Sequence, residues 1–308
     1  MVTPADTGTL ARLLPGYPPP RHWRRVPATG QHYLDVGTGD PVLFLHGNPA
    51  WSYIWREPLR RLSPHARCLA PDLPGFGLSR RLRPADGVPD PYRAQLDALD
   101  ALYDHLVANE GVPAAGWTLV LHDWGGPLGY AWALRHPGAV ARLVVCNTVA
   151  FPWPPGFQLP FYLRWMRDHA PVAAAVHRVN GFARIAVRAG VHHPLSRAER
   201  RAYLAPHTRR AERRALTDAV RAIPRDSADP AWQLLEPPSP QADVTRLPLL
   251  IAWGMRDPVF TPALLTEWAH RHPHADIHRF PDAGHYVMED APELGDLIRD
   301  FMAGDPAR

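Results

Sequence analysis

Short apolar runs alternate with amphipathic stretches over residues 31–150, which is the pattern of strands buried on both faces and separated by helices. The predicted strands are HYLDVG, VLFLH, RCLAP, TLVLH and RLVVCN, at residues 32–37, 42–46, 67–71, 118–122 and 142–147. Helices are predicted at about residues 51–62, 93–109 and 125–136. This alternation predicts a mostly parallel, doubly wound α/β sheet.

The same alternation returns after residue 247. PLLIAWG and DIHRF, at residues 248–254 and 276–280, are predicted strands, and PALLTEWAHRH at 262–272 and the stretch at 290–303 are predicted helices. We therefore expect one α/β core built from residues 31–150 and 236–308, preceded by an N-terminal extension at residues 1–30.

Residues 151–235 do not follow this alternation. They are helical in pattern, rich in arginine and interrupted by proline, and they contain no convincing strand. An insertion between two strands of an open α/β sheet can lie over the carboxyl ends of the strands, where such sheets bind ligands. We therefore predict a helical cap at residues 151–235. Its arginines indicate either a solvated helical face or a guide for an anionic substrate.

Composition narrows the class of protein. The chain has 308 residues, 46% of them hydrophobic, which is enough for one large α/β domain with an insertion. A formal net charge of only +4 does not predict a nucleic-acid partner. The chain has no run of 18 apolar residues and its first residues lack the apolar core of a signal peptide, so we expect no membrane span and a cytoplasmic enzyme.

The stretch LHDWGG at residues 121–126 predicts a nucleophile elbow, because a strand runs into it and a helix follows. In such an elbow a strained turn lifts one side chain off the sheet, and here that residue is Asp123. The alternative is that Asp123 only caps the helix. Residues further along the chain favour the elbow.

Two later residues complete a candidate catalytic triad. Asp257 in WGMRDPVF follows a predicted strand, and His285 in DAGHYVMED lies in a loop before the last helix. The order nucleophile, acid, histidine is that of the α/β-hydrolases. We predict Asp123 as nucleophile, His285 as base and Asp257 as the residue that orients the imidazole.

The segment LFLHGNP places a tight turn at the end of an earlier strand. In α/β-hydrolases the backbone N–H groups of this loop and of the residue after the nucleophile form the oxyanion hole. These residues are Asn48 and Trp124. The alternative is that His46 and Gly47 merely make a turn.

Five motifs in this order resemble the haloalkane dehalogenase family of the α/β-hydrolases: HGNPAWSYIWR, APDLPGFGLS, LHDWGGPLGYAWA, WGMRDPVF and DAGHYVMED. The resemblance implies that Asp123 displaces a halide from an alkyl carbon while the Trp124 indole and the Asn48 carboxamide bind the leaving ion. Water activated by His285 then attacks the ester of Asp123. Some relatives place a glutamate where this chain has Asn147, so the acid role falls to Asp257.

A closer resemblance connects the chain to the branch that contains the β-lactone decarboxylases of olefin biosynthesis. It rests on LPGYPP, NTVAFPWPP, VNGFAR, RAYLAPH and the spacing to RAIP, whereas residues 207–219 depart from the branch. It implies conversion of a cis-β-lactone (2-oxetanone) to a cis-alkene and CO2, and biosynthetic partner enzymes if the pathway is present. We favour this reaction over hydrolytic dehalogenation.

Aromatic residues of the cap are candidates for an apolar pocket suited to a small electrophilic substrate. We predict that Phe151, Trp153, Phe161 and Tyr162 contribute to it, although packing in the core is the alternative for each. Tyr162 and Tyr203 also suggest an alternative activity, that of an epoxide hydrolase, in which cap tyrosines polarise the ring oxygen. Asn48 argues against that activity, because such relatives usually have an apolar or aromatic residue there.

The sequence predicts no cofactor and no metal site. Its one dense histidine cluster, HRHPH at residues 270–274, follows a predicted helix and is typical of a surface tract. A binding protein that retains the hydrolase scaffold is the alternative from another class. It predicts a degraded triad or elbow, and both motifs are intact here.

Overall fold

An eight-stranded sheet forms the centre of the protein, in the order β1-β2-β4-β3-β5-β6-β7-β8. The structure is a computed structural model, and it describes residues 4–80, 91–239 and 242–304. The strands are β1 (Trp23–Arg25), β2 (His32–Val36), β3 (Pro41–Leu45), β4 (Arg67–Pro71), β5 (Trp117–His122), β6 (Val140–Cys146), β7 (Leu249–Gly254) and β8 (Asp276–Phe280). Strand β2 pairs antiparallel with β1 and β4, and all other pairs are parallel.

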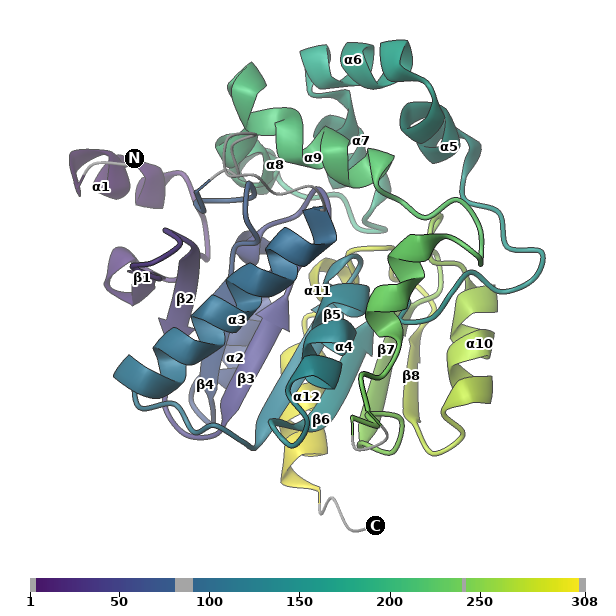
Figure 1. Ribbon diagram of the computed structural model, residues 1–308. Coiled ribbons are helices and arrows are strands. Elements are labelled where there is room, and N and C mark those ends of the chain that lie inside the picture. Colours follow the sequence, from purple (N-terminus) through teal and green to yellow (C-terminus); the bar gives the residue numbers. More distant parts are fainter. Residues whose placement is uncertain (1–3, 81–90, 240–241, 305–308) are drawn as a thin grey trace.

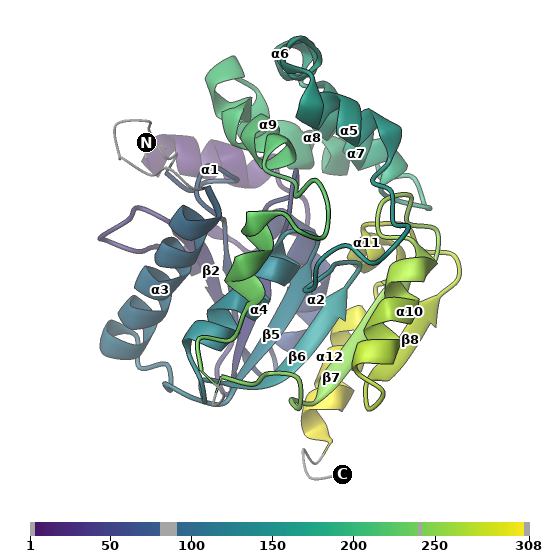
Figure 2. The ribbon, with the colours of Figure 1, turned by 45° about the vertical axis from the view of Figure 1, so that its right-hand side comes forward.

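Helices cover both faces of this sheet (Figures 1 and 2). The α-helices are α1 (Pro4–Arg12), α2 (Arg56–Leu62), α3 (Pro91–Asn109), α4 (Gly125–Arg135), α5 (Phe161–Asp168), α6 (Ala170–Val179), α7 (Gly181–Ala189), α8 (Arg197–Leu204), α9 (Arg214–Arg221), α10 (Pro262–Arg271), α11 (Val287–Asp290) and α12 (Leu294–Ala303). Short 3-10 helices are η1 (Pro20–His22), η2 (Ser52–Trp55), η4 (Ala205–His207), η5 (Arg210–Arg213) and η6 (Pro230–Leu235).

Alternate side chains of each central strand pack into two separate cores. Leu43 and Leu45 of β3 belong to the core shared with α3, α4 and α10, whereas Val42 and Phe44 belong to the core shared with α2 and α12. Successive side chains of a strand point to opposite faces, so a strand covered on both sides must be apolar throughout. This explains why the buried strands appear in the sequence as continuous apolar runs.

The predicted doubly wound, mostly parallel sheet is confirmed, with each of the seven predicted strands at or within a residue or two of its observed position. The predicted N-terminal extension at residues 1–30 is more structured than expected. It contains α1 and the edge strand β1, which pairs with β2. A strand of three residues, Trp-Arg-Arg, is too short and too polar to show an alternating pattern.

Helices α5 to α9 lie together above the carboxyl ends of the parallel strands (Figure 1). All residues from 151 to 235 are described, and none of them forms a strand. Near the end of this segment, η6 descends to pack beside α4 on the sheet (Figure 2). We keep the word cap for residues 151–235 as predicted from the sequence.

Candidate active site

The turn after β5 holds Asp123 in a left-handed conformation, with φ of +50°. This conformation is costly for a residue other than glycine, and it is the geometry by which a nucleophile elbow lifts its side chain off the sheet. The neighbours of the turn must be small, because a Cβ atom at Gly47 would overlap the Asp123 carboxylate and one at Gly126 would overlap the Thr148 side chain. The glycines therefore give Asp123 its space.

The structure brings Asp123, Asp257 and His285 together at the carboxyl ends of β5 and β7 and in the loop after β8. His285 Nδ1 lies 2.8 Å from Asp257 Oδ2, and His285 Nε2 lies 3.5 Å from Asp123 Oδ2. A carboxylate at Nδ1 leaves the proton of a neutral imidazole on that nitrogen and the lone pair on Nε2, facing Asp123. This is the arrangement that a base requires, whereas a protonated imidazole presents its Nε2–H to the Asp123 carboxylate.

Besides His285, three hydrogen-bond donors hold the Asp257 carboxylate. Its Oδ1 accepts hydrogen bonds from the backbone N–H groups of Val259 and Phe260, at 2.7 and 3.0 Å. Its Oδ2 accepts one from Asn147 Nδ2, at 3.0 Å. The Asp257 side chain is fully buried. A buried carboxylate with this many donors is held in one orientation, so Asp257 fixes the ring of His285.

Asn147 is a partner that the sequence indicated only as a departure from relatives with glutamate. It follows β6, has φ of +39°, and exchanges hydrogen bonds with the backbone of Gly254 at the end of β7. The amide therefore joins two neighbouring strand ends and donates to Asp257. The only sequence feature that pointed to a role for Asn147 in the site was its position directly after a buried strand.

The loop that carries His285 is anchored from below by His122. His122 Nε2 lies 2.9 Å from the carbonyl oxygen of His285. A carbonyl oxygen only accepts, so Nε2 carries the proton and donates. His122 Nδ1 is buried without a partner among the described residues, and burial lowers the pKa of His122 well below its ordinary value. A neutral His122 thus supports the backbone of His285.

Asp290 anchors the same loop from its other end. Its buried carboxylate accepts hydrogen bonds from the backbone N–H groups of Gly284, His192 and His193, each at 2.8 Å. Gly284 precedes His285, and the two histidines follow α7 in the cap. The Asp290 carboxylate therefore holds both the loop that carries His285 and the segment that follows α7 in the cap. Nothing in the sequence identified this residue.

Burial sets the titration of the two central groups. It raises the pKa of Asp123, and the His285 charge and the backbone N–H groups of Trp124 and Asn48 oppose this rise without cancelling it. Burial alone lowers the pKa of His285, but the charge and hydrogen bond of Asp257 and the charge of Asp123 raise it above its ordinary value. A proton at this site is retained to higher pH than on either free side chain.

Asn48 lies beside the candidate nucleophile. Its backbone N–H donates to Asp123 Oδ1 at 2.6 Å. Its carboxamide Nδ2 donates to the carbonyl oxygen of Leu216 in α9, at 3.0 Å. One N–H of this carboxamide is thus engaged by the cap. Trp124 lies on the wall of the same pocket.

An apolar pocket leads from the Asp123 carboxylate into the cap. Two of the four predicted aromatic wall residues, Trp153 and Tyr162, line it. The prediction was wrong for the other two: Phe151 is buried against Trp268, with ring centroids 5.2 Å apart, and Phe161 is 70% exposed outside the pocket. The sequence pattern indicates which side of an element is apolar, but it does not indicate which other element packs on that side.

The other pocket walls were not predicted. They include Leu163, Phe182, Ile185 and Val220 from cap helices and Phe260 after β7. The Phe260 ring is stacked on His285 with centroids 5.6 Å apart. Tyr203, which raised the epoxide hydrolase alternative, does not line this pocket, since its hydroxyl donates to Glu289. A paired-tyrosine site for an epoxide oxygen is therefore not formed.

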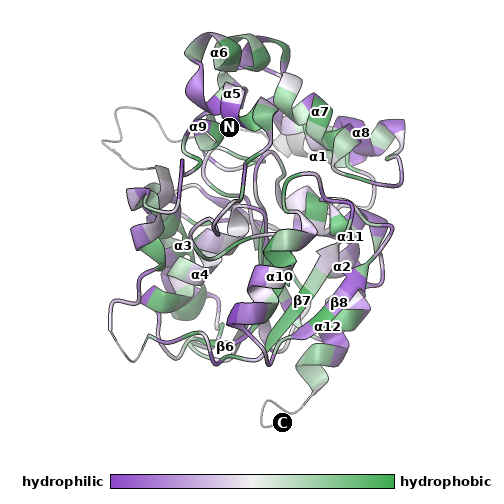
Figure 3. Cartoon of the chain, turned by 90° about the vertical axis from the view of Figure 1, so that its right-hand side faces the viewer, coloured by the Kyte–Doolittle hydropathy of each residue, from purple (hydrophilic) through white to green (hydrophobic). Residues whose placement is uncertain are grey.

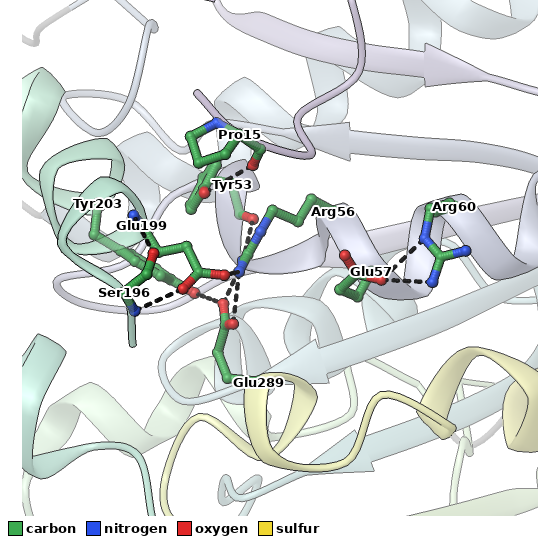
Figure 4. Close-up of polar contacts among 9 residues, drawn as sticks. All are labelled: Pro15, Tyr53, Arg56, Glu57, Arg60, Ser196, Glu199, Tyr203 and Glu289. Atoms are coloured by element: carbon green, nitrogen blue, oxygen red, sulfur yellow. Dashed lines mark hydrogen bonds and ion pairs between the residues drawn. The ribbon is translucent and has the colours of Figure 1, made fainter. Parts of the chain in front are cut away.

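A buried ion pair between two core helices also contacts two residues of the cap helix α8 (Figure 4). Arg56 of α2 contacts both carboxylate oxygens of Glu289 in α11, one of them at 2.7 Å, and Glu199 of α8 at 3.1 Å. Tyr203 of α8 donates to the same Glu289. Arg56 and Glu289 are 3% and 5% exposed. Two core helices and one cap helix thus meet at a single guanidinium.

Within the described ranges, no group of three or more His, Cys, Asp or Glu side chains is arranged to hold a metal ion. Among those same residues, no helix has the length and apolar character needed to cross a membrane.

Comparisons with known proteins identify the family of this chain. A family model described as alpha/beta hydrolase fold matches residues 40–292. The chain is 37% identical to a cis-3-alkyl-4-alkyloxetan-2-one decarboxylase of Xanthomonas campestris over 302 residues, which cover 95% of this chain and 99% of the relative. It is 32% identical to a haloalkane dehalogenase of Mycobacterium tuberculosis over 263 residues, which cover 85% and 87%.

A solved structure is similar over nearly the same length. The crystal structure of a haloalkane dehalogenase from Bradyrhizobium elkani matches with a TM-score of 0.77 and 29% identity, covering 92% of this chain and 97% of that one. The chain therefore belongs to the alpha/beta hydrolase fold family, and within it to the group that contains the haloalkane dehalogenases and the cis-3-alkyl-4-alkyloxetan-2-one decarboxylases.

Proposed function

We propose that the protein converts a cis-3,4-dialkyl-oxetan-2-one to a cis-alkene and CO2. The observation that carries this proposal is the extent of the similarity to an oxetanone decarboxylase. An alignment over 95% of the chain includes the cap, and cap helices supply most of the apolar walls above Asp123. An apolar pocket with one carboxylate at its end suits a substrate with alkyl chains and one electrophilic carbon.

In the first step, Asp123 attacks C4, the saturated ring carbon that is bonded to the ring oxygen. The bond between that carbon and the ring oxygen breaks, and its electron pair remains on the oxygen. The products are an alkyl ester of Asp123 and a free carboxylate on the substrate. The Trp124 indole and the Asn48 carboxamide are the candidate donors to that carboxylate, by the roles that the family resemblance implies.

In the second step, the carbon–carbon bond to the carboxylate breaks and CO2 leaves. Its electron pair forms the double bond as the ester carbon–oxygen bond breaks and Asp123 recovers its carboxylate. Inversion at the first step followed by departure of the two groups from opposite faces retains the cis arrangement. No proton moves and no water is consumed, so His285 acts by its charge and hydrogen bonding.

Hydrolytic dehalogenation is the second candidate, because Trp124 and the triad geometry serve it equally and a solved dehalogenase is similar over 92% of the chain. There Asp123 expels a halide, and His285 must remove a proton from the water that attacks the ester. The two reactions differ in their need for a base.

The experiment supplies purified protein with a long-chain cis-β-lactone and, separately, with 1-bromobutane. We expect alkene and CO2 in equal amounts from the lactone, and no alkene from Asp123→Asn. Halide release without alkene formation would overturn the proposal.

The variant His285→Gln separates the two mechanisms further. Under decarboxylation it retains turnover and accumulates no ester, since no water has to be activated. Under dehalogenation it releases one halide per active site and then stops, with the alkyl group attached to Asp123 and visible as a mass increase.

Three further predictions accompany this function: a cytoplasmic location, partner enzymes that act before it in an olefin-forming pathway, and the division at residues 31–150, 151–235 and 236–308. A β-lactone is formed by closure of a β-hydroxy acid, so the partner reaction must activate and close such an acid.

A further inference from the structure

The apolar side chains exposed on this protein are concentrated on the cap. The described residues include six large hydrophobic side chains that are strongly exposed, and five of them lie in α5, α6 and α7. These five, which we call the cap patch, are Phe161, Tyr162, Trp165, Val179 and Ile185, with 43% to 70% of each side chain exposed. Scattered exposed apolar residues are ordinary, but a concentration of this kind marks an interaction surface.

Two residues of the cap patch also belong to the wall of the apolar pocket. Tyr162 and Ile185 are exposed at 43% and 62%, and both also line the pocket that ends at Asp123. The Phe161 ring contacts that of Tyr162, with centroids 5.8 Å apart, and Trp165 follows Phe161 by four positions on the same side of α5. What docks on the patch therefore contacts two side chains that also line the site.

The same three helices carry positive charge without compensation. Residues 161–190 contain five arginines and one acidic residue, so their net charge equals the +4 of the entire chain. The single acid, Asp168, is already paired with Arg167 and Arg225. The remaining arginines form no ion pair with any residue in the described part of the chain; they are Arg164, Arg178, Arg184 and Arg188.

We propose that the cap patch docks on an anionic lipid bilayer. Exposed Phe, Tyr and Trp beside arginine is the composition of elements that lie in a membrane interface, with aromatic rings at the headgroup level and cations on anionic lipids. Docking of a second copy of this chain is disfavoured, because two surfaces with a net charge of +4 each would repel one another. Helices α5, α6 and α7 stand at the end of the molecule beyond the sheet, where a flat surface can reach them (Figures 1 and 3).

Docking in this way places these two pocket-lining side chains against the phase in which a long-chain apolar substrate is concentrated. The delivery of substrate from the bilayer rests on the proposed function, whereas the binding of the cap patch to the bilayer does not. Vesicle binding and alkene formation are measured separately, so the two proposals fail separately.

The test is co-sedimentation with vesicles, either of phosphatidylcholine alone or with about one-quarter phosphatidylglycerol, a fraction chosen to supply negative surface charge. We expect binding to the anionic vesicles and a loss of binding as NaCl rises from about 0.1 M to about 0.5 M, because salt screens the arginines. The variants Phe161→Ser with Trp165→Ser, and Arg164→Ser with Arg184→Ser, should each reduce the bound fraction by about fivefold or more.

The matched control is Leu13→Ser, which removes the sixth exposed side chain, 56% exposed near α1 and outside the cap. It should leave binding unchanged. Circular dichroism checks that each variant folds. Absence of binding to anionic vesicles, or equal binding by the aromatic variants and the control, would refute the proposal. A self-association in ultracentrifugation that Trp165→Ser abolishes, without vesicle binding, would assign the patch to a second copy instead.

Discussion

Asn147 donates a hydrogen bond to Asp257, from Nδ2 to Oδ2 over 3.0 Å, and that same carboxylate oxygen lies 2.8 Å from His285 Nδ1. An amide and a carboxylate after neighbouring strands thus meet at one imidazole. Since asparagine and aspartate have the same shape, the two positions can exchange their chemistry with little change in packing.

We predict that Asp257→Asn reduces kcat for hydrolytic dehalogenation by about 1,000-fold or more, because that route needs His285 as a base and the imidazole loses the carboxylate that sets its tautomer and balances its charge. Adding Asn147→Asp restores a carboxylate within reach of His285, and we expect it to recover at least about tenfold of that loss. Turnover of 1-bromobutane is the measurement, since decarboxylation of the lactone needs no base. A double variant no more active than Asp257→Asn would show that the Asn147 position cannot serve His285.

The pH dependence of kcat/KM follows from the raised pKa of Asp123. The nucleophile must be ionised, so activity is present above the pKa and is lost as the pH falls through it. Because burial raises that pKa, the acid limb should lie above the ordinary aspartate value of about 3.9. Replacing His285 with glutamine removes a charge that lowers the pKa of Asp123, so the acid limb of any remaining activity should move to still higher pH.

The alkaline side separates the two candidate reactions. The pKa of His285 is raised above its ordinary value, and a hydrolytic route needs the neutral imidazole. Dehalogenase turnover should then increase as the pH rises through a value above about 6.5. Decarboxylation needs no base, so its rate should show no such rise.

Gly47→Ala should inactivate the enzyme without unfolding it. The new Cβ atom would overlap the carboxylate of Asp123, which has to turn away from the pocket. Displacement of a reacting group by about 1 Å costs about 100-fold in rate, so we expect a fall in kcat of at least that size. Gly181→Ala is the control, since its new Cβ would lie no closer than 3.4 Å to the nearest side-chain atom, on Val179. Activity equal to that of the control would contradict the crowding at the elbow.

Arg56→Leu should lower the free energy of unfolding by about 3–5 kcal/mol, because the buried Glu289 carboxylate loses its charge partner and the half-buried Glu199 carboxylate loses a contact. Urea unfolding measures it. Arg60→Leu is the matched control on the same helix: Arg60 is 62% exposed, and its pair with Glu57 is worth about 1 kcal/mol or less (Figure 4). Equal effects of the two variants would show that the buried Arg56 contacts stabilise the protein no more than an exposed pair does.

Adding Glu289→Leu to Arg56→Leu should recover part of the lost stability, because the uncompensated charge is then removed as well. An unchanged or lower stability in the double variant would mean that packing, and not charge, determines the effect of Arg56.

The sequence alone determined the sheet, because strands such as β5 are covered on both faces and must be apolar throughout. It also indicated the three residues that meet at the candidate site, since parallel strands end at one edge and side chains after those ends converge. The insertion between β6 and β7 was visible as a break in the same alternation.

Only the tertiary structure decided which side chains form the pocket and which hold His285 in place. Phe151 and Phe161 are both aromatic residues at the start of the cap, yet one is buried against Trp268 and the other is 70% exposed. Support of His285 by His122 and Asp290 depends on contacts between segments far apart in the chain. Local patterns describe one element at a time, whereas these roles arise where several elements pack together.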